Sequence, residues 1–166
     1  QYVSILDKEN VGLLDTRKTT PGLRILEKYA TACGGGFNHR MGLFDRILIK
    51  DNHLAALGIS SIKDFSTFLT KVKNNSDNNL LEIEIDSIEY LETAIDAGVD
   101  AILLDNFEPS EIRKAVSVND NRVVIEASGG ISLKSLNEFA KTQPHFISTG
   151  APIHTSRWRD IGLDWK

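Results

Sequence analysis

Short apolar runs alternate with amphipathic segments along the whole of this 166-residue chain. Most of the apolar runs contain no polar alternation, which is typical of strands that are buried on both faces of a sheet. The predicted strands lie at residues 13–14, 47–49, 80–85, 101–104, 123–127 and 146–148. Such strands are expected to be parallel, with helices that cross over between them.

The segments between the predicted strands have helical spacing. Leu23, Ile25, Leu26 and Tyr29 fall on one face of a helix, and Pro21 stands where a helix can begin. Further helices are predicted at residues 62–72, 88–97, 111–116 and 133–140, each flanked by turn-forming residues. Strands and helices therefore alternate from end to end.

This alternation predicts an α/β protein with an incomplete (β/α) barrel of parallel strands. A closed eight-fold barrel takes about 250 residues, so about six strands leave either an incomplete barrel or an open sheet. Residues 1–10 read as the end of a helix already under way, a linking helix, and residues 11–166 as one barrel domain. In either architecture the active site is expected at the carboxyl ends of the strands.

Composition narrows the class of partner. The chain carries 19 Lys plus Arg against 23 Asp plus Glu, a net charge of -4, which argues against a nucleic-acid-binding surface. No apolar stretch approaches the roughly 20 residues that cross a bilayer, so no membrane association is expected. The single cysteine excludes an intrachain disulfide and fits a reducing compartment, so we expect a cytoplasmic protein.

Basic residues nevertheless gather where strands end. Arg17 and Lys18 follow the first predicted strand, His39 and Arg40 follow a triple-glycine turn, and Lys50 follows the second strand. Guanidinium groups suit planar, bidentate contacts with carboxylates. Each arginine alone could be an ordinary surface ion pair. Their placement at successive strand ends instead indicates a small ligand with several negative charges.

Acidic residues lie within or directly after two of the predicted strands. Glu82, Glu84 and Asp86 alternate with aliphatic residues and share one face of a strand, while Asp105 follows a fully apolar strand. If that face is buried, cations or a metal must oppose the charges; the alternative is a solvated sheet face. Asp105 could also cap a turn. Glu84 and Asp105 on neighbouring strands could bind Mg²⁺ or stabilise positive charge on a sugar carbon.

Two glycine-containing turns predict a phosphate site. Ser128, Gly129 and Gly130 join a strand to a helix, and Gly150 follows the next strand. Glycines expose backbone N–H groups, and phosphate sites of (β/α) barrels often use the last two such loops. Simple turn chemistry is the alternative. His154 could donate to the same phosphate, although a lone loop histidine is often structural.

Five sequence blocks occur in the order that is found in one enzyme family. They are Asp15-Thr16-Arg17-Lys18-Thr19-Thr20-Pro21-Gly22, Gly35-Gly36-Phe37-Asn38-His39-Arg40, Ile49-Lys50-Asp51-Asn52-His53, Leu104-Asp105-Asn106-Phe107 and Ala127-Ser128-Gly129-Gly130-Ile131. Through them the chain closely resembles the C-terminal barrel part of quinolinate phosphoribosyltransferase, the carboxylating nicotinate-nucleotide pyrophosphorylase. This family carries an additional N-terminal domain that the sequence does not include.

The resemblance implies a pentosyltransferase of NAD biosynthesis. Its reaction joins quinolinate and phosphoribosyl pyrophosphate with Mg²⁺ and yields nicotinate mononucleotide, pyrophosphate and CO2. The implied substrate-binding residues are Thr16, Arg17, Lys18, His39, Arg40, Lys50, Glu84, Asp105, Ser128, Gly129, Gly130, Gly150, Ala151 and His154. Of these, Lys18, Glu84 and Asp105 are implied to be catalytic, and Glu84 and Asp105 to bind Mg²⁺.

The resemblance also implies a homodimer or higher homo-oligomer, in which a partner's N-terminal domain, or a separate N-terminal chain, completes the site. Two other hypotheses stay open. This chain could be an isolated barrel fragment that binds a phosphorylated ligand but needs a second chain for turnover. It could also be a related phosphoribosyltransferase that acts on another aromatic acid.

Overall fold

The computed structural model describes residues 1–76, 79–157 and 160–165, in which six parallel strands form one sheet. The strands are β1 (Gly12–Leu14), β2 (Ile47–Ile49), β3 (Leu81–Ile85), β4 (Ala101–Asp105), β5 (Val124–Ser128) and β6 (Phe146–Ser148). Their order is β1-β6-β5-β4-β3-β2, so the first and second strands lie at opposite edges. The sheet is curved but not closed, which confirms the predicted incomplete barrel.

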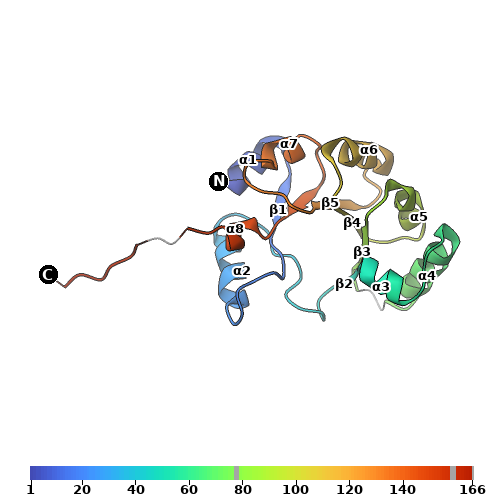
Figure 1. Cartoon of the computed structure of the whole chain (residues 1–166), viewed down its shortest axis with the longest axis horizontal. Helices are drawn as coiled ribbons and strands as arrows, with labels where there is room; N and C mark the ends of the chain where they lie inside the picture. The colour runs from blue at the N-terminus through green and yellow to red at the C-terminus, as the bar shows by residue number, and fades with distance from the viewer. Residues whose placement is uncertain (77–78, 158–159, 166) are drawn as a thin grey trace.

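Helices follow the strands around the outside of the sheet (Figure 1). They are α1 (Tyr2–Leu6), α2 (Arg24–Cys33), α3 (Asp51–Ala56), α4 (Ile62–Asn74), α5 (Leu91–Asp96), α6 (Pro109–Asn119), α7 (Leu136–Ala140) and α8 (Ala151–His154), with 3-10 turns η1 (Asp7–Glu9) and η2 (Ile88–Tyr90). Between α2 and β2 the ring stays open. None of the described helices is long and apolar enough to cross a membrane.

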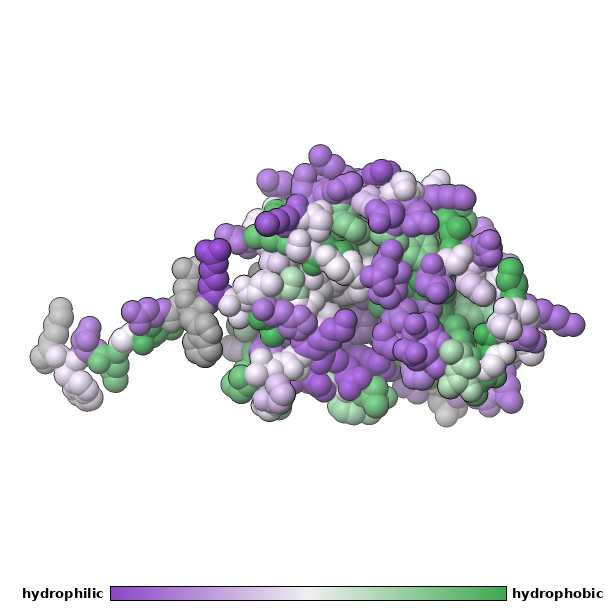
Figure 2. Space-filling model, viewed as in Figure 1, coloured by the Kyte–Doolittle hydropathy of each residue, from purple (hydrophilic) through white to green (hydrophobic). Residues whose placement is uncertain are grey.

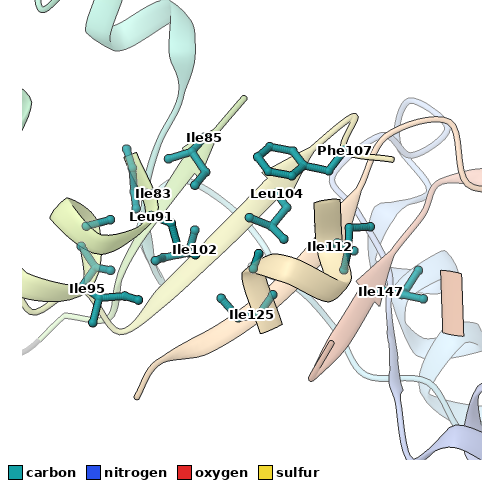
Figure 3. Close-up of a cluster of buried hydrophobic side chains, with 14 of the residues drawn as sticks. Ile83, Ile85, Leu91, Ile95, Ile102, Leu104, Phe107, Ile112, Ile125 and Ile147 are labelled. Atoms are coloured by element: carbon teal, nitrogen blue, oxygen red, sulfur yellow. The ribbon is translucent and has the colours of Figure 1, made fainter. Parts of the chain in front are cut away.

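The main core lies between the sheet and the outer helices. Figure 3 shows Ile83, Ile102, Leu104 and Ile125 on the strands, in one cluster with side chains of the outer helices such as Ile112 on α6. All five side chains are fully buried. Such continuous aliphatic strands are what the apolar runs predicted.

The predicted elements are found, with changes at their ends. The helix expected at 111–116 extends over the whole of α6, the segment 133–140 is helical only from Leu136, and 88–97 divides into η2 and α5. The short helices α3 and α8 were not predicted, because one or two turns carry too little periodicity to stand out.

Helix α2 buries a different face from the one its spacing indicated. Ile25, Leu26 and Tyr29 are 74%, 64% and 69% exposed, whereas Lys28 is 1% exposed. The helix itself is as predicted, but its apolar stripe faces away from the barrel, and a charged side chain faces inward. The stripe of Ile25, Leu26 and Tyr29 is called the α2 apolar face below.

The segment from Phe37 to Arg46 occupies the open side of the barrel. Phe37 pairs with Leu14 like a short added strand: its N–H donates to Leu13 O at 2.8 Å, and its carbonyl accepts from Asp15 N–H at 3.1 Å. The chain then turns inward, so that His39 and Arg40 are buried. A loop rather than a strand thus fills this side of the barrel.

Candidate active site at the carboxyl ends of the strands

A cavity of about 240 Å³ opens at the carboxyl ends of the strands and is called the catalytic-end cavity below. Its lining includes nine of the residues that the sequence nominated, namely Thr16, Arg17, Lys18, His39, Arg40, Lys50, Glu84, Asp105 and Ser128. Leu48, Leu103, Glu126 and Ser148 complete the lining. On the face that Figure 2 shows, hydrophilic side chains cover the middle of the molecule, between α2 and α3. Strand order therefore brings most of the predicted rim into one place.

Positive charge is concentrated on one side of this cavity. Burial lowers the pKa of Arg40, and the neighbouring charge of Arg17 lowers it further. Arg17 Nε is buried and has no hydrogen-bond partner among the described residues. Two guanidinium groups that repel each other, one with a free buried donor, favour an anion between them.

The predicted acidic pair lies in the same cavity. Glu84 forms an ion pair with Lys50, and Asp105 Oδ2 accepts from Asn106 Nδ2 at 2.8 Å. Glu84 is buried, so this part of the strand face is not solvated, and a cation opposes the charge as expected. Asp86, the third acid of that strand pattern, is exposed and lies outside the cavity.

The glycine turn after β5 has a backbone conformation that glycine adopts most easily. Gly129 has φ +103°, and a Cβ placed there would lie 2.6 Å from Asn106 N, so a larger residue would collide with the loop after β4. Thr149 Oγ1 donates to Ile131 O at 2.6 Å, which ties the loops after β5 and β6 together. These two loops therefore stand next to each other at the same end of the sheet.

The remaining nominated residues flank the cavity without lining it: Gly129, Gly130, Gly150, Ala151 and His154. Ala151 N–H donates to Thr149 Oγ1 at 3.1 Å, so this backbone donor already has a partner. His154 Nε2 lies 3.1 Å from Lys18 O, and its ring packs against Gly150. The histidine thus links the loop after β6 to the loop after β1.

A buried polar network, which we call the Lys28 network, fixes the segment that carries His39. Lys28 Nζ donates to Asp15 Oδ1 at 2.5 Å and to His39 O at 2.9 Å. His39 N–H donates to Asp15 Oδ1 at 2.7 Å, and Asn38 Nδ2 donates to Asp15 Oδ2 at 2.8 Å. Helix α2, β1 and the inward-turning segment are therefore held together by one ion pair.

Beneath the cavity lies a charged group of side chains, the barrel-centre cluster of His39, Arg46, Glu82 and Glu126. His39 Nε2 is 3.2 Å from Glu82 Oε2 and 3.4 Å from Glu126 Oε2, and Arg46 Nη1 donates to Glu82 Oε2 at 3.2 Å. The sequence placed Glu82 on one strand face with Glu84 and left open whether that face is buried, and it did not nominate Glu126 or Arg46. A lone glutamate in the apolar run Val124-Ile125-Glu126-Ala127 was the available signal.

The cluster shifts its own titration. Burial by itself would lower the pKa of His39, but hydrogen bonds and negative charge from Glu126 and Glu82 outweigh it and raise the pKa to about 9. Burial and the charge of Glu82 raise the pKa of Glu126. Burial opposes ionisation of Glu82 too, but His39 and Arg46 hold its pKa below the usual range. His39, Glu82 and Glu126 titrate together, so their shifted pKa values describe the cluster and not one side chain alone.

The ring nitrogens show where those protons lie. His39 Nδ1 accepts from Arg40 N–H at 2.7 Å, so while this bond stands the single ring proton is on Nε2. That hydrogen bond opposes a second proton on the ring, and we therefore assign the acidic proton of the cluster to Glu126. Although His39, Glu82 and Glu126 lie close enough to hold a metal ion, a protonated Nε2 is not a metal ligand.

The fold and site together define an incomplete α/β barrel with a polyanion-sized site, in which cations, two carboxylates and two glycine loops meet. The chain matches the family described as quinolinate phosphoribosyl transferase, C-terminal domain, over residues 1–164. It is 45% identical to a probable carboxylating nicotinate-nucleotide pyrophosphorylase of Bacillus subtilis, over 99% of this chain and 55% of that protein.

Solved structures agree with this match. The nicotinate-nucleotide pyrophosphorylase of Francisella tularensis superposes with a TM-score of 0.83 at 43% identity, over 92% of this chain and 52% of that one. The Ehrlichia chaffeensis protein gives a TM-score of 0.88 at 39% identity, over 98% of this chain and 58% of that one. The chain therefore belongs to the quinolinate phosphoribosyl transferase family. It spans about half the length of the relatives it matches.

Proposed function

We propose that this chain is the barrel part of an enzyme that transfers a phosphoribosyl group from phosphoribosyl pyrophosphate to quinolinate and removes one carboxylate as CO2. The observation that carries this proposal is the catalytic-end cavity, where basic groups face the acids Glu84 and Asp105 beside two glycine loops. Quinolinate has two adjacent carboxylates and its co-substrate has phosphates at both ends, which is the charge pattern that this lining would bind. The relatives' names supply the reaction, and the lining supports it.

The basic side of the cavity suits the aromatic acid. Arg17, Arg40 and Lys50 would bind the quinolinate carboxylates, and Arg17 Nε is a buried donor without a partner among the described residues. Lys18, on the exposed rim, would contact the pyrophosphate. His39 would act here mainly through its position, because its ring faces Glu82 and Glu126.

The acidic side suits the ribose and a magnesium ion. Carboxylate oxygens are the protein ligands that Mg²⁺ takes, and it commonly uses one or two of them together with substrate phosphates. Glu84 and Asp105 provide that donor set, so the residues fit the ion. Mg²⁺ would screen the charge of the leaving pyrophosphate, and the same two carboxylates would stabilise positive charge on the ribose carbon.

The two glycine loops would hold the 5′-phosphate. Ser128, Gly129 and Gly130 would supply backbone N–H groups at the turn after β5, ahead of α7, which begins at Leu136. After β6, Gly150 and His154 are the available donors, because Pro152 lacks an N–H and that of Ala151 is bonded to Thr149. The phosphate would therefore depend more on the loop after β5.

The chemistry follows from this arrangement. The quinolinate ring nitrogen attacks the anomeric carbon of the ribose while the bond to pyrophosphate breaks. The ribosylated nitrogen is then cationic and stabilises the electron pair that stays on the adjacent ring carbon when CO2 departs. Residues of this chain orient both reactants and stabilise charge, and no organic cofactor is needed.

We further propose that a second copy of the chain, with the portion that the longer relatives carry, covers the α2 apolar face. Three large apolar side chains are exposed on a helix whose opposite face is tied to His39. A homodimer would bury them and would bring a further basic residue to the site. The cytoplasmic location stays a prediction.

A turnover assay tests the function. This chain is mixed with quinolinate, phosphoribosyl pyrophosphate and Mg²⁺, alone and with the amino-terminal part of the Bacillus subtilis relative, and nicotinate mononucleotide and CO2 are measured. Product in either mixture supports the proposal, and Arg40→Ala or Lys50→Ala should raise the quinolinate KM strongly. Arg113→Ala, on the exposed side of α6, is the matched control.

Two results would contradict it. If calorimetry shows that phosphoribosyl pyrophosphate binds but no mixture turns over, the chain is a binding fragment. If only another aromatic acid is consumed in a substrate panel, the chain is a related transferase with different specificity.

A further inference from the structure

Glu126 lies between two cavities at opposite ends of the barrel. The second cavity, about 270 Å³, is the amino-end cavity. It is lined by Leu14, Phe37, Asn38, Arg46, Leu80, Leu81, Glu82, Asp100, Ala101, Val124, Glu126 and Phe146. Among the described residues, Glu126 is the only one that lines both cavities. A single side chain therefore borders the catalytic end and the far end of the barrel.

The position of Glu126 in the sheet explains this. It stands in the middle of β5, paired with Leu103 of β4 on one side and Phe146 of β6 on the other. The side chain is 2% exposed, and Oε1 has no hydrogen-bond partner among the described residues. Burying a carboxylate with an unpaired oxygen costs far more free energy than burying a neutral carboxylic acid.

Burial and the charge of Glu82, which faces it from β3, favour the acid form of Glu126 and raise its pKa. His39, which with Arg46 belongs to the segment between β1 and β2, and Ser148 on β6 act in the opposite direction without reversing the shift. Arg46 already balances the charge of Glu82. With His39 accepting the Arg40 amide at Nδ1, a protonated Glu126 leaves the cluster electrically neutral.

We propose that Glu126 is the general acid that gives the decarboxylated ring its proton. The inference rests on the proposed function. When CO2 leaves, the carbon–carbon bond breaks and its electron pair stays on the ring carbon next to the cationic nitrogen. The O–H bond of Glu126 then breaks, its proton forms the new C–H bond, and Glu126 becomes a carboxylate.

The amino-end cavity provides the return path for the proton. Water that enters from that side reaches Glu126 without passing the substrate, so the acid is restored while the product still fills the catalytic end. The two lysines that line the catalytic-end cavity are less suited to donate this proton. Lys50 is paired with Glu84, and Lys18 lies on the exposed rim.

A single-turnover experiment with Glu126→Gln tests the role. It uses the assembly that the turnover assay shows to be competent, and it follows pyrophosphate and nicotinate mononucleotide separately. Glutamine keeps the size of the side chain but has no acidic proton, so pyrophosphate should still be released while mononucleotide formation slows about 100-fold. Glu138→Gln, the same change at an exposed glutamate of α7, is the matched control, and its two products should stay coupled in time.

Two outcomes overturn the role in different ways. Mononucleotide that appears together with pyrophosphate in Glu126→Gln shows that another group donates the proton, while the proposed function stands. If the unmodified assembly releases no pyrophosphate from quinolinate and phosphoribosyl pyrophosphate, the proposed function fails and this role fails with it.

A second variant keeps the test independent of folding. Glu126→Asp keeps the acid but shortens its reach, so mononucleotide should form more slowly than in the parent and faster than in Glu126→Gln. Equal rates of mononucleotide formation in the two variants would reject Glu126 as the donor.

Discussion

Helices α2 and α4 are both amphipathic, yet they face the barrel with opposite kinds of side chain. Helix α4 buries Phe65 and Leu69 in the core and turns Lys63 and Lys71 to solvent. Helix α2 buries Lys28 and leaves Ile25 and Leu26 exposed. The two helices have similar apolar content, so composition does not separate them.

The difference shows that an apolar stripe can serve the fold or a partner. The stripe of α4 is used by the core of this chain, whereas α2 is attached by the Lys28 network and its stripe stays exposed, as the proposed partner surface requires. Lys28 also donates to the His39 carbonyl. A partner that covers α2 would therefore contact the helix that positions His39. Four predictions follow from that contrast, in order of decreasing effect.

On α4, Phe65→Ala should lower the free energy of unfolding by about 4 kcal/mol, because a fully buried ring leaves a cavity in the core. Urea unfolding followed by circular dichroism measures it. Thr67→Ala, on the exposed side of the same helix, is the control and should stay within about 0.5 kcal/mol. Equal losses for the two variants would mean that α4 does not depend on its buried stripe.

On α2, Lys28→Met should cost about 3 kcal/mol, because Asp15 is left buried without its cation. The same measurement applies, and the quinolinate KM should rise more than the KM for phosphoribosyl pyrophosphate, since the His39 segment loses its tie. Adding Asp15→Asn should restore part of the stability but not the KM. If the Lys28→Met protein is as stable as the parent, the Lys28 network does not attach α2 to the barrel.

The pH dependence of the unfolding free energy should come from the barrel-centre cluster and not from the core beneath α4. The barrel-centre cluster as a whole binds a proton more tightly in the folded state, as the rise of the His39 pKa from 6.5 to about 9 indicates, so this stabilisation is complete below pH 6.5 and is lost as the pH rises through 9. The raised pKa of Glu126 acts in the same direction. We expect unfolding free energy to fall by about 2 kcal/mol between pH 6.5 and 9.5.

Urea titrations at several pH values measure that fall. His39→Asn should flatten the profile, while Phe65→Ala should shift it downward without changing its slope, because Phe65 lies outside the barrel-centre cluster. Stability that rises toward pH 9 would contradict the assignment of bound protons to this cluster.

The smallest effect on stability should come from the α2 apolar face. Leu26→Ser combined with Tyr29→Ser should change the unfolding free energy of the chain alone by about 0.5 kcal/mol or less. In analytical ultracentrifugation of the assembly that is active in the turnover assay, this double variant should fail to associate. Leu133→Ser, a change of a partly exposed leucine elsewhere, is the control that should leave association intact.

The sequence predicted the strands well because buried parallel strands are continuous apolar runs. It also predicted most of the rim, since parallel strands bring their carboxyl ends to one edge and Arg17, Lys50, Glu84 and Asp105 each lie at or just after such an end. The helix at α2 was predicted, but its buried face was not, because hydrophobic spacing cannot tell which of two surfaces covers a stripe.

The polar interior was the part that spacing could not show. Lys28 and Asp15 are separated by 13 positions and meet only through the turn that brings α2 back to β1. His39 points inward because that pair holds its backbone, so its direction depends on tertiary contacts. Glu126 could have been flagged as a lone charge in an apolar strand, whereas its proton and its second cavity required the structure.

Strand β1, near the start of the chain, pairs with β6, near its end. During synthesis the guanidinium and ammonium groups of the first third are therefore made long before the strand that places the phosphate loops beside them. Contacts of such sequence separation form late, because the loop-closure entropy must be overcome first. A nascent chain that lacks β6 should be unable to bind substrate, so ligand binding reports the completed polypeptide.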